Sequence, residues 1–139
     1  TLKNNGFKIY SGGTDTHLML VDLRPFNVKG NLAAESLSRA NITCNKNGIP
    51  FDSESPMITS GIRLGSQAAT TRGFGLKEFE IVGKLITKVI DGLSKNPNDN
   101  SKVEDEVRKE VVSLCSSFPI YKNLRKWFAQ YAKKEKLQL

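Results

Sequence analysis

Apolar and polar positions in the first half of the chain follow the short alternating runs that are typical of β-strands. Residues 7–10 alternate over one short segment, and residues 17–23 carry a nearly continuous apolar run that predicts a buried strand. Two consecutive glycines separate these runs, and a glycine pair favours a tight turn. We therefore expect an antiparallel strand pair, followed by two further short strands over residues 42–44 and 60–65.

Helical spacing of apolar residues predicts three helices. Residues 31–41 form the first, with an asparagine of the right type to cap its N-terminus. A longer amphipathic helix is predicted around residues 79–93, where apolar side chains recur every three or four positions. Ser101 and Glu104 form a capping-box pattern at the start of the last helix, which extends to Phe118.

Strands in the first half and helices in the second half are typical of an α+β domain, in which a small antiparallel sheet is covered by helices. Between the third and fourth predicted strands, residues 45–59 contain two prolines, one glycine and many side chains that can bond to the local backbone. These residues are expected to form a long ordered loop. Loops of this length are often functional.

The composition is that of an ordinary soluble domain. With 139 residues, of which 38% are hydrophobic and 25% charged, the chain is expected to fold as one domain with its own core. Its longest apolar run is residues 18–21, whereas a helix that spans a bilayer needs about 20 apolar residues. No secretory signal is recognisable in the sequence. Two cysteines in a chain that needs no disulfide suggest reduced thiols. We therefore expect a cytoplasmic protein with no membrane partner.

The net charge of +7 is concentrated at the C-terminal end of the chain. Residues 122–139 hold six basic residues and one acidic residue, whereas residues 1–121 hold 15 basic and 13 acidic residues. The tail therefore carries +5, and composition reveals no basic face on the body of the chain. Apolar residues at helical spacing in the tail, Trp127 among them, predict an amphipathic helix that docks on its own protein. The alternative is a free-standing interaction or polyanion-binding module that acts through the tail.

Few residues of the chain could carry chemistry by themselves. His17 is the single histidine, so a zinc site with two histidines cannot form, and we expect a structural role for it. Neither Cys44 nor Cys115 has a histidine close in sequence that would activate its thiol. Arg63 stands among glycines, and its guanidinium could bind a carboxylate through two parallel hydrogen bonds. A structural salt bridge of Arg63 is the alternative.

Four segments with specific sequences follow one another along the chain. They are SGGTDTH at residues 11–17, RANITCNKN at 39–47, SPMITSGIRLG at 55–65 and TRGF at 71–74. Together they resemble the C-terminal domain of serine hydroxymethyltransferase, with the order and spacing of that family. The resemblance implies that residues 1–121 are the small α+β domain of an enzyme with the aspartate-aminotransferase fold type. Residues 122–139 are then a basic C-terminal extension.

The resemblance also implies an activity and its partners. The family uses pyridoxal 5'-phosphate to interconvert serine plus tetrahydrofolate with glycine plus 5,10-methylenetetrahydrofolate. Its members have a large domain that holds most of the coenzyme pocket, and they form dimers or tetramers. The implied partners of this chain are therefore serine or glycine, tetrahydrofolate, the large domain and a second subunit, whereas nucleic acid is not expected.

Individual residues match positions of known role in the resembling family. Arg63 matches the arginine that holds the carboxylate of the amino acid, and Asn47 matches a residue that contacts the folate pterin. Ser55, Pro56 and Met57 match the loop beside the folate site, although Met57 replaces an aromatic residue. None of the lysines resembles the lysine that bonds to the coenzyme. The chain is therefore expected to be one piece of the enzyme and to be inactive alone.

Asp15, His17, Lys46 and Arg72 also fall within the matching segments. For these residues we expect either structural roles or support of the residues that touch substrate.

Overall fold

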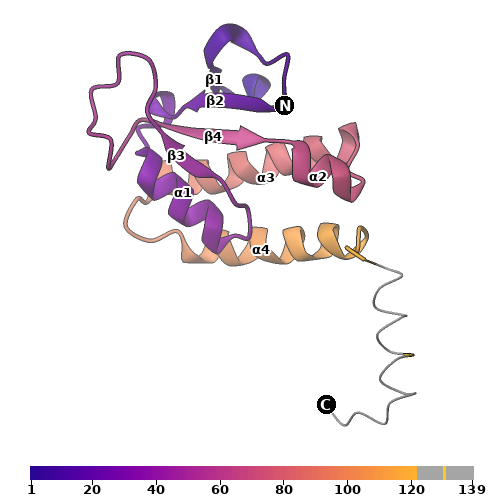
Figure 1. Cartoon of the computed structure of the whole chain (residues 1–139). Helices are drawn as coiled ribbons and strands as arrows, with labels where there is room; N and C mark the ends of the chain where they lie inside the picture. Colours follow the sequence, from indigo (N-terminus) through magenta and orange to yellow (C-terminus); the bar gives the residue numbers. More distant parts are fainter. Residues whose placement is uncertain (122–129, 131–139) are drawn as a thin grey trace.

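The computed structural model of the chain describes residues 1–121 and 130. Four strands form an antiparallel sheet in the order β1-β2-β4-β3. The helices α1, α3 and α4 lie on one side of this sheet (Figure 1). The strands are β1 (Lys8–Ile9), β2 (Leu18–Asp22), β3 (Asn45–Asn47) and β4 (Gly61–Gly65). The predicted α+β class is confirmed.

The helices account for most of the remaining chain. They are α1 (Gly30–Arg39), α2 (Gln67–Arg72), α3 (Leu76–Lys95) and α4 (Ser101–Ser116), with short 3-10 turns η1 (Lys3–Asn5), η2 (Tyr10–Gly12) and η3 (Arg24–Phe26). Helix α4 packs on α1 and α3 and lies farther from the sheet than they do (Figure 1). Within the described ranges, no helix has the length and apolar character needed to span a membrane.

The core lies between the sheet and the helices. Val21 of β2 and Ile62 of β4 are directly opposite in register, and both are fully buried. Residues opposite each other in an antiparallel pair point to the same face, so both side chains face the helices. The apolar stripe of α3 meets them, and its buried members include Leu85, Ile86, Val89, Ile90 and Leu93. The predicted period of three and four residues in this helix is confirmed.

The third strand lies three residues later than the sequence pattern predicts. Residues 42–44 were expected to be the strand, but the pairing with β4 involves Asn45–Asn47. The amide of Ile42 instead donates to the carbonyl of Leu37 and closes the end of α1 (2.8 Å). Ile42 and Cys44 pack against the core, so their apolar pattern reflects burial after a helix and not a strand.

The start of α1 also differs from the prediction. Asn31 was expected to be the N-cap, but the helix begins at Gly30 and no side chain caps it. The amides of Gly30 and Asn31 donate to the carbonyls of Thr59 and Ile58, both at 2.9 Å. Backbone carbonyls of the long loop therefore satisfy the free N–H groups of this helix end. The contact is so close that a Cβ atom at Gly30 would lie 2.1 Å from Thr59 Oγ1.

The predicted capping box of α4 does not form. Helix α4 begins at Ser101 as expected, but the carboxylate of Glu104 turns inward and accepts hydrogen bonds from Arg39 Nε (2.7 Å) and Ser36 Oγ (2.6 Å). The hydrogen bond from Arg39 lowers the pKa of Glu104, against the opposing effect of burial. Glu104 thus joins α4 to α1.

Helix α2 was not predicted, because its sequence QAATTR has no apolar stripe. Arg72 at its end donates to the carbonyls of Phe118 (2.6 Å) and Cys115 (2.9 Å), which ties α2 to the end of α4. These contacts agree with the structural role expected of Arg72. The basic extension predicted over 122–139 lies outside the described residues, apart from position 130.

Candidate substrate-binding site

The helices leave one face of the sheet open, and Arg63 lies on it. Arg63 is directly opposite Leu20 of β2 and Asn45 of β3, one position after the buried Ile62. Because side chains alternate along a strand, Arg63 points away from the helices and its side chain is exposed. No hydrogen bond or ion pair to its guanidinium occurs among residues 1–121. Within this part of the chain its five N–H donors therefore have no partner, and a ligand can accept hydrogen bonds from them.

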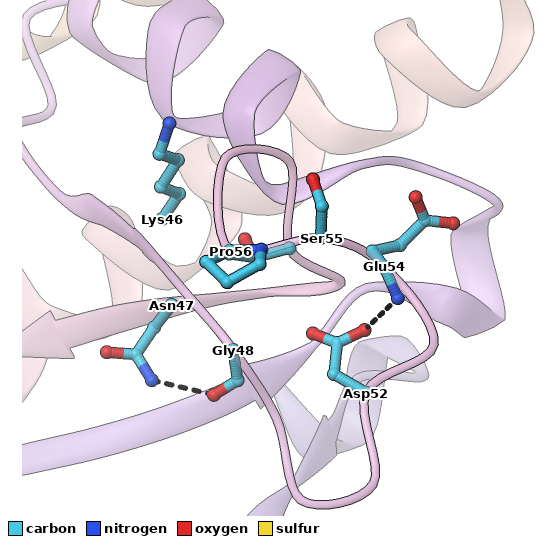
Figure 2. A pocket seen from close by; sticks show the side chains of 8 residues that line it. Lys46, Asn47, Gly48, Asp52, Glu54, Ser55 and Pro56 are labelled. Atoms are coloured by element: carbon cyan, nitrogen blue, oxygen red, sulfur yellow. Dashed lines mark hydrogen bonds between the residues drawn. The ribbon is translucent and has the colours of Figure 1, made fainter.

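Asn47 ends the edge strand β3 and lies on the same face of the sheet as Arg63. It is opposite Gly61, two residues before Arg63 on the neighbouring strand. Its side chain is half-buried, and its Nδ2 donates to the carbonyl of Gly48 at 2.7 Å (Figure 2). This bond fixes the direction of the amide, whose oxygen can accept a hydrogen bond from a ligand.

A pocket of about 440 Å³ lies between the end of β3 and the long loop (Figure 2). Three of the predicted folate residues, Asn47, Ser55 and Pro56, line it together with Lys46, Gly48, Asp52, Glu54 and Thr59. Their meeting is not obvious from spacing, because Asn47 and Ser55 belong to different segments. Arg63 does not line this pocket.

Met57, the remaining predicted folate residue, lies outside the pocket lining. Its side chain is 74% exposed, and its carbonyl accepts a hydrogen bond from Lys46 Nζ at 2.6 Å. Lys46 thus fastens the end of the loop to the edge strand, which agrees with the structural role expected of it. The structure therefore places Met57 at the rim of the loop.

The loop is held by a carboxylate that the sequence did not single out. Asp52 accepts hydrogen bonds from the amides of Ile49 (3.1 Å), Glu54 (3.0 Å) and Ser60 (2.9 Å) and from Ser60 Oγ (2.6 Å). Desolvation acts to raise the pKa of Asp52, but the bonds from Ser60, Glu54 and Ile49 outweigh it and hold the pKa well below its usual range. The available signal was an aspartate inside a proline-rich loop, where such side chains bond to nearby amides.

A second hollow of about 790 Å³ borders the open face. The turn over residues 11–16 lines it, as do Leu18 and Leu20 of β2. Since Leu20 is directly opposite Arg63, the guanidinium lies next to this hollow. The first matching segment, SGGTDTH, and the third, which contains Arg63, are thereby brought to one face of the sheet. His17 itself is exposed just before β2, although the sequence placed it within that strand.

The described lysines offer no sheltered, unbonded amine of the kind to which a coenzyme attaches. Covalent attachment of pyridoxal phosphate needs a lysine in a sheltered pocket, but each described lysine is exposed except Lys46, which is half-buried and bonded to Met57. Burial raises the pKa of Cys44 to about 11, so its thiol is protonated at neutral pH and a poor nucleophile. Among the described residues, no three histidine, cysteine or acidic side chains are grouped to hold a metal ion. The arrangement is suited to binding and orienting ligands.

Comparison with known proteins assigns the chain to a family. The family model for serine hydroxymethyltransferase matches residues 1–86, which include all four strands and the long loop. This range holds Arg63, Asn47 and every residue that lines the 440 Å³ pocket.

Individual relatives agree with the family model. The chain is 85% identical over 125 residues to serine hydroxymethyltransferase of Pelagibacter ubique (strain HTCC1062), covering 90% of this chain and 29% of the relative. It is 62% identical over 121 residues to serine hydroxymethyltransferase 3 of Colwellia psychrerythraea (strain 34H / ATCC BAA-681), covering 87% of this chain and 28% of that protein. The chain therefore spans less than a third of the length of these relatives, and it matches the C-terminal part of the first.

Proposed function

Since the chain belongs to the serine hydroxymethyltransferase family, we propose that it is the part of such an enzyme that holds the two substrates, serine or glycine and tetrahydrofolate. The full-length enzyme, of which this chain forms the C-terminal part, would transfer a one-carbon unit from serine to tetrahydrofolate. Glycine and 5,10-methylenetetrahydrofolate are the products of this transfer. The observation that carries the proposal is the placement of Arg63 and Asn47 on one open face of the sheet.

Arg63 would bind the carboxylate of serine or glycine. A guanidinium offers parallel donors in one plane, so it orients a carboxylate as well as attracting it. The central strand β4 fixes the backbone of Arg63 by pairing with β2 and β3 on its two sides. The exposed guanidinium is then available to a substrate held between this domain and the rest of the enzyme.

The 440 Å³ pocket would receive part of tetrahydrofolate. The amide of Asn47 can donate to and accept from the polar edge of a pterin ring. Ser55 adds a hydroxyl and Pro56 an apolar surface to the lining. Most residues that line the pocket are polar or charged, so hydrogen bonds would determine how a ligand is oriented there.

Pyridoxal 5'-phosphate, when bound, supplies the electron sink for breaking a bond to the α-carbon of the amino acid. We propose that the large domain of the full-length enzyme holds most of it. The contribution of this chain is orientation, because the bond that breaks must lie across the plane of the coenzyme ring. We further propose that the enzyme acts as a dimer or tetramer in the cytoplasm, in line with its family.

An activity assay of the full-length enzyme tests this function. The purified enzyme, loaded with pyridoxal phosphate, is expected to convert serine to glycine much faster when tetrahydrofolate is present than when it is absent. The expected second product is 5,10-methylenetetrahydrofolate in equal amount. Absence of glycine formation from serine with both the coenzyme and tetrahydrofolate present would contradict the proposal.

A further inference from the structure

The carboxylate of Asp52 lies where the long loop meets the start of β4. Its Oδ1 accepts from the amide of Glu54 and from Ser60 Oγ, and its Oδ2 accepts from the amides of Ile49 and Ser60. One side chain thus collects donors from residues eleven positions apart in the chain. Figure 2 shows the carboxylate at the wall of the pocket, with its bond to the amide of Glu54.

Ser60 connects this carboxylate to the sheet. Ser60 is 3% exposed, and its carbonyl accepts from the amide of Leu23 at 2.9 Å, directly after β2. Ser60 itself directly precedes β4. Its position is therefore set by the sheet, and the two bonds from Ser60 to Asp52 hold the loop against this fixed point.

The loop needs such an anchor because part of its backbone is in an unfavourable conformation. Phe51 and Thr59 have φ angles of 56° and 62°, in the left-handed region that costs non-glycine residues energy. Phe51 is also 100% exposed, so packing of its ring does not hold that turn. An ion pair between Lys29 and Glu54 also holds the loop. Since both its members are partly exposed, it is a weaker restraint than the bonds of Asp52.

From these contacts we infer that Asp52 is a positioning residue for the folate side of the site: it sets the place of Ser55, Pro56 and the turn after Asn47 relative to the sheet. The inference rests on the proposed function. Arg63 is held by strand pairing on both sides and does not depend on Asp52. Asp52 therefore affects the use of tetrahydrofolate and leaves the binding of the amino acid unchanged.

Asp52→Asn in the full-length enzyme tests this inference. An amide has one accepting oxygen where the carboxylate has two, so its NH2 group would face amides that need an acceptor. We expect the KM for tetrahydrofolate to rise about tenfold, which is the loss of roughly one hydrogen bond to a charged group. The KM for serine and the folate-independent cleavage of a β-hydroxy amino acid are expected to stay within about twofold of wild type.

Two further variants separate positioning from loss of stability. Ser60→Ala removes one hydrogen-bond donor to Asp52 and keeps the carboxylate, so it is expected to raise the KM for tetrahydrofolate by a smaller factor. If Asp52→Asn does not fold, Ser60→Ala tests the inference in its place. Glu104→Gln is the matched control, because Glu104 is a buried carboxylate with comparable partners between α1 and α4 and does not line the pocket. It is expected to lower stability without changing the KM for tetrahydrofolate.

The outcomes distinguish this inference from the proposed function. One outcome is that Asn47→Ala raises the KM for tetrahydrofolate, whereas Asp52→Asn changes this KM no more than Glu104→Gln does. In that case the inferred positioning role of Asp52 is wrong and the proposed function stands. An equal rise in the KM for serine and for tetrahydrofolate in Asp52→Asn would likewise overturn the inference. If the wild-type enzyme does not use tetrahydrofolate, both proposals fail.

Discussion

Arg63 and Asn47 are diagonal neighbours on adjacent antiparallel strands. Asn45 is directly opposite Arg63, and Asn47 is opposite Gly61, so the two side chains leave the same face of the sheet two positions apart. Diagonal neighbours of this kind lie roughly 7–8 Å apart. The sheet is a rigid element, and it places two groups side by side. The guanidinium of Arg63 can bind a carboxylate, and the amide of Asn47 can form hydrogen bonds with a polar ring. This spacing supports the proposal that one face of the domain holds both substrates.

Replacing Arg63 with lysine in the full-length enzyme is expected to weaken binding of the amino acid. An ammonium group cannot reproduce two parallel hydrogen bonds in one plane. The loss of one charge-assisted bond corresponds to about ten- to a hundredfold in the KM for serine. Steady-state kinetics and a coenzyme titration measure the effect, and coenzyme affinity should be nearly unchanged. Equal loss of affinity for serine and for the coenzyme would assign Arg63 a structural role.

Replacing Gly61 with alanine is expected to destabilise the sheet below the pocket. A Cβ atom at this position would lie 2.6 Å from Ile49 Cγ2 and 2.7 Å from the carbonyl oxygen of Val21. Overpacking of this kind costs about 1–3 kcal/mol, because a backbone atom cannot move aside. Urea unfolding measures the free energy of unfolding. Gly13→Ala is the matched control, since a Cβ atom there meets nothing within 4 Å, and a similar loss in both variants would contradict the account.

Acid is expected to loosen the contact between α1 and α4. The hydrogen bond from Arg39 lowers the pKa of Glu104, with a further bond from Ser36 and an opposing effect of burial. A carboxyl group whose pKa is lower in the folded than in the unfolded state stabilises the folded protein. This contribution is fully present at pH values above the unfolded-state pKa of about 4.3. Its contribution is lost as the pH falls through the folded value.

Melting temperatures between neutral pH and pH 3 test this dependence. Glu104→Gln should lower the melting temperature at neutral pH and reduce its fall on acidification. Glu106→Gln is the control, because the ion pair of Glu106 with Lys88 is exposed and screened by solvent. An unchanged acid dependence in Glu104→Gln would show that other carboxyl groups control it.

The isolated chain is expected to form no specific bond to pyridoxal phosphate. Its described lysines are exposed or already bonded, so none offers the sheltered amine that covalent attachment requires. Incubation with the coenzyme, borohydride reduction and peptide mass spectrometry should reveal no stoichiometric label at one site. Full labelling of a single lysine would contradict the assignment of the coenzyme to the large domain.

Long elements of the fold could be predicted from the sequence because burial leaves a clear period in them. The apolar repeats of α3 and α4 and the apolar run of β2 identified these elements, and the α+β class followed from their order. The structure brings Asn47, Ser55 and Pro56 to one pocket, and their binding of folate stays a prediction. The long loop was expected to be ordered, and its hydrogen bonds to Asp52 explain why it can be.

Elements stabilised by distant contacts could not be predicted. Strand β3 has the polar sequence NKN and exists because β4 offers a free edge for pairing. The cap of α1 comes from loop carbonyls almost thirty residues away, and no local pattern reveals it. Glu104 matched a capping box, but its buried carboxylate instead bonds to Arg39, 65 residues earlier in the chain. In each case a tertiary contact decided between local alternatives.

The central claim is that this chain presents separate groups to the two substrates, and Asn47→Ala in the full-length enzyme tests it most directly. The account predicts a rise in the KM for tetrahydrofolate of about ten- to a hundredfold, since a buried polar partner left unpaired costs about 1–3 kcal/mol. Cleavage of a β-hydroxy amino acid, which needs no folate, should stay nearly unchanged in the same preparation. A parallel loss of both activities would contradict the claim, because Asn47 would then shape the active site as a whole.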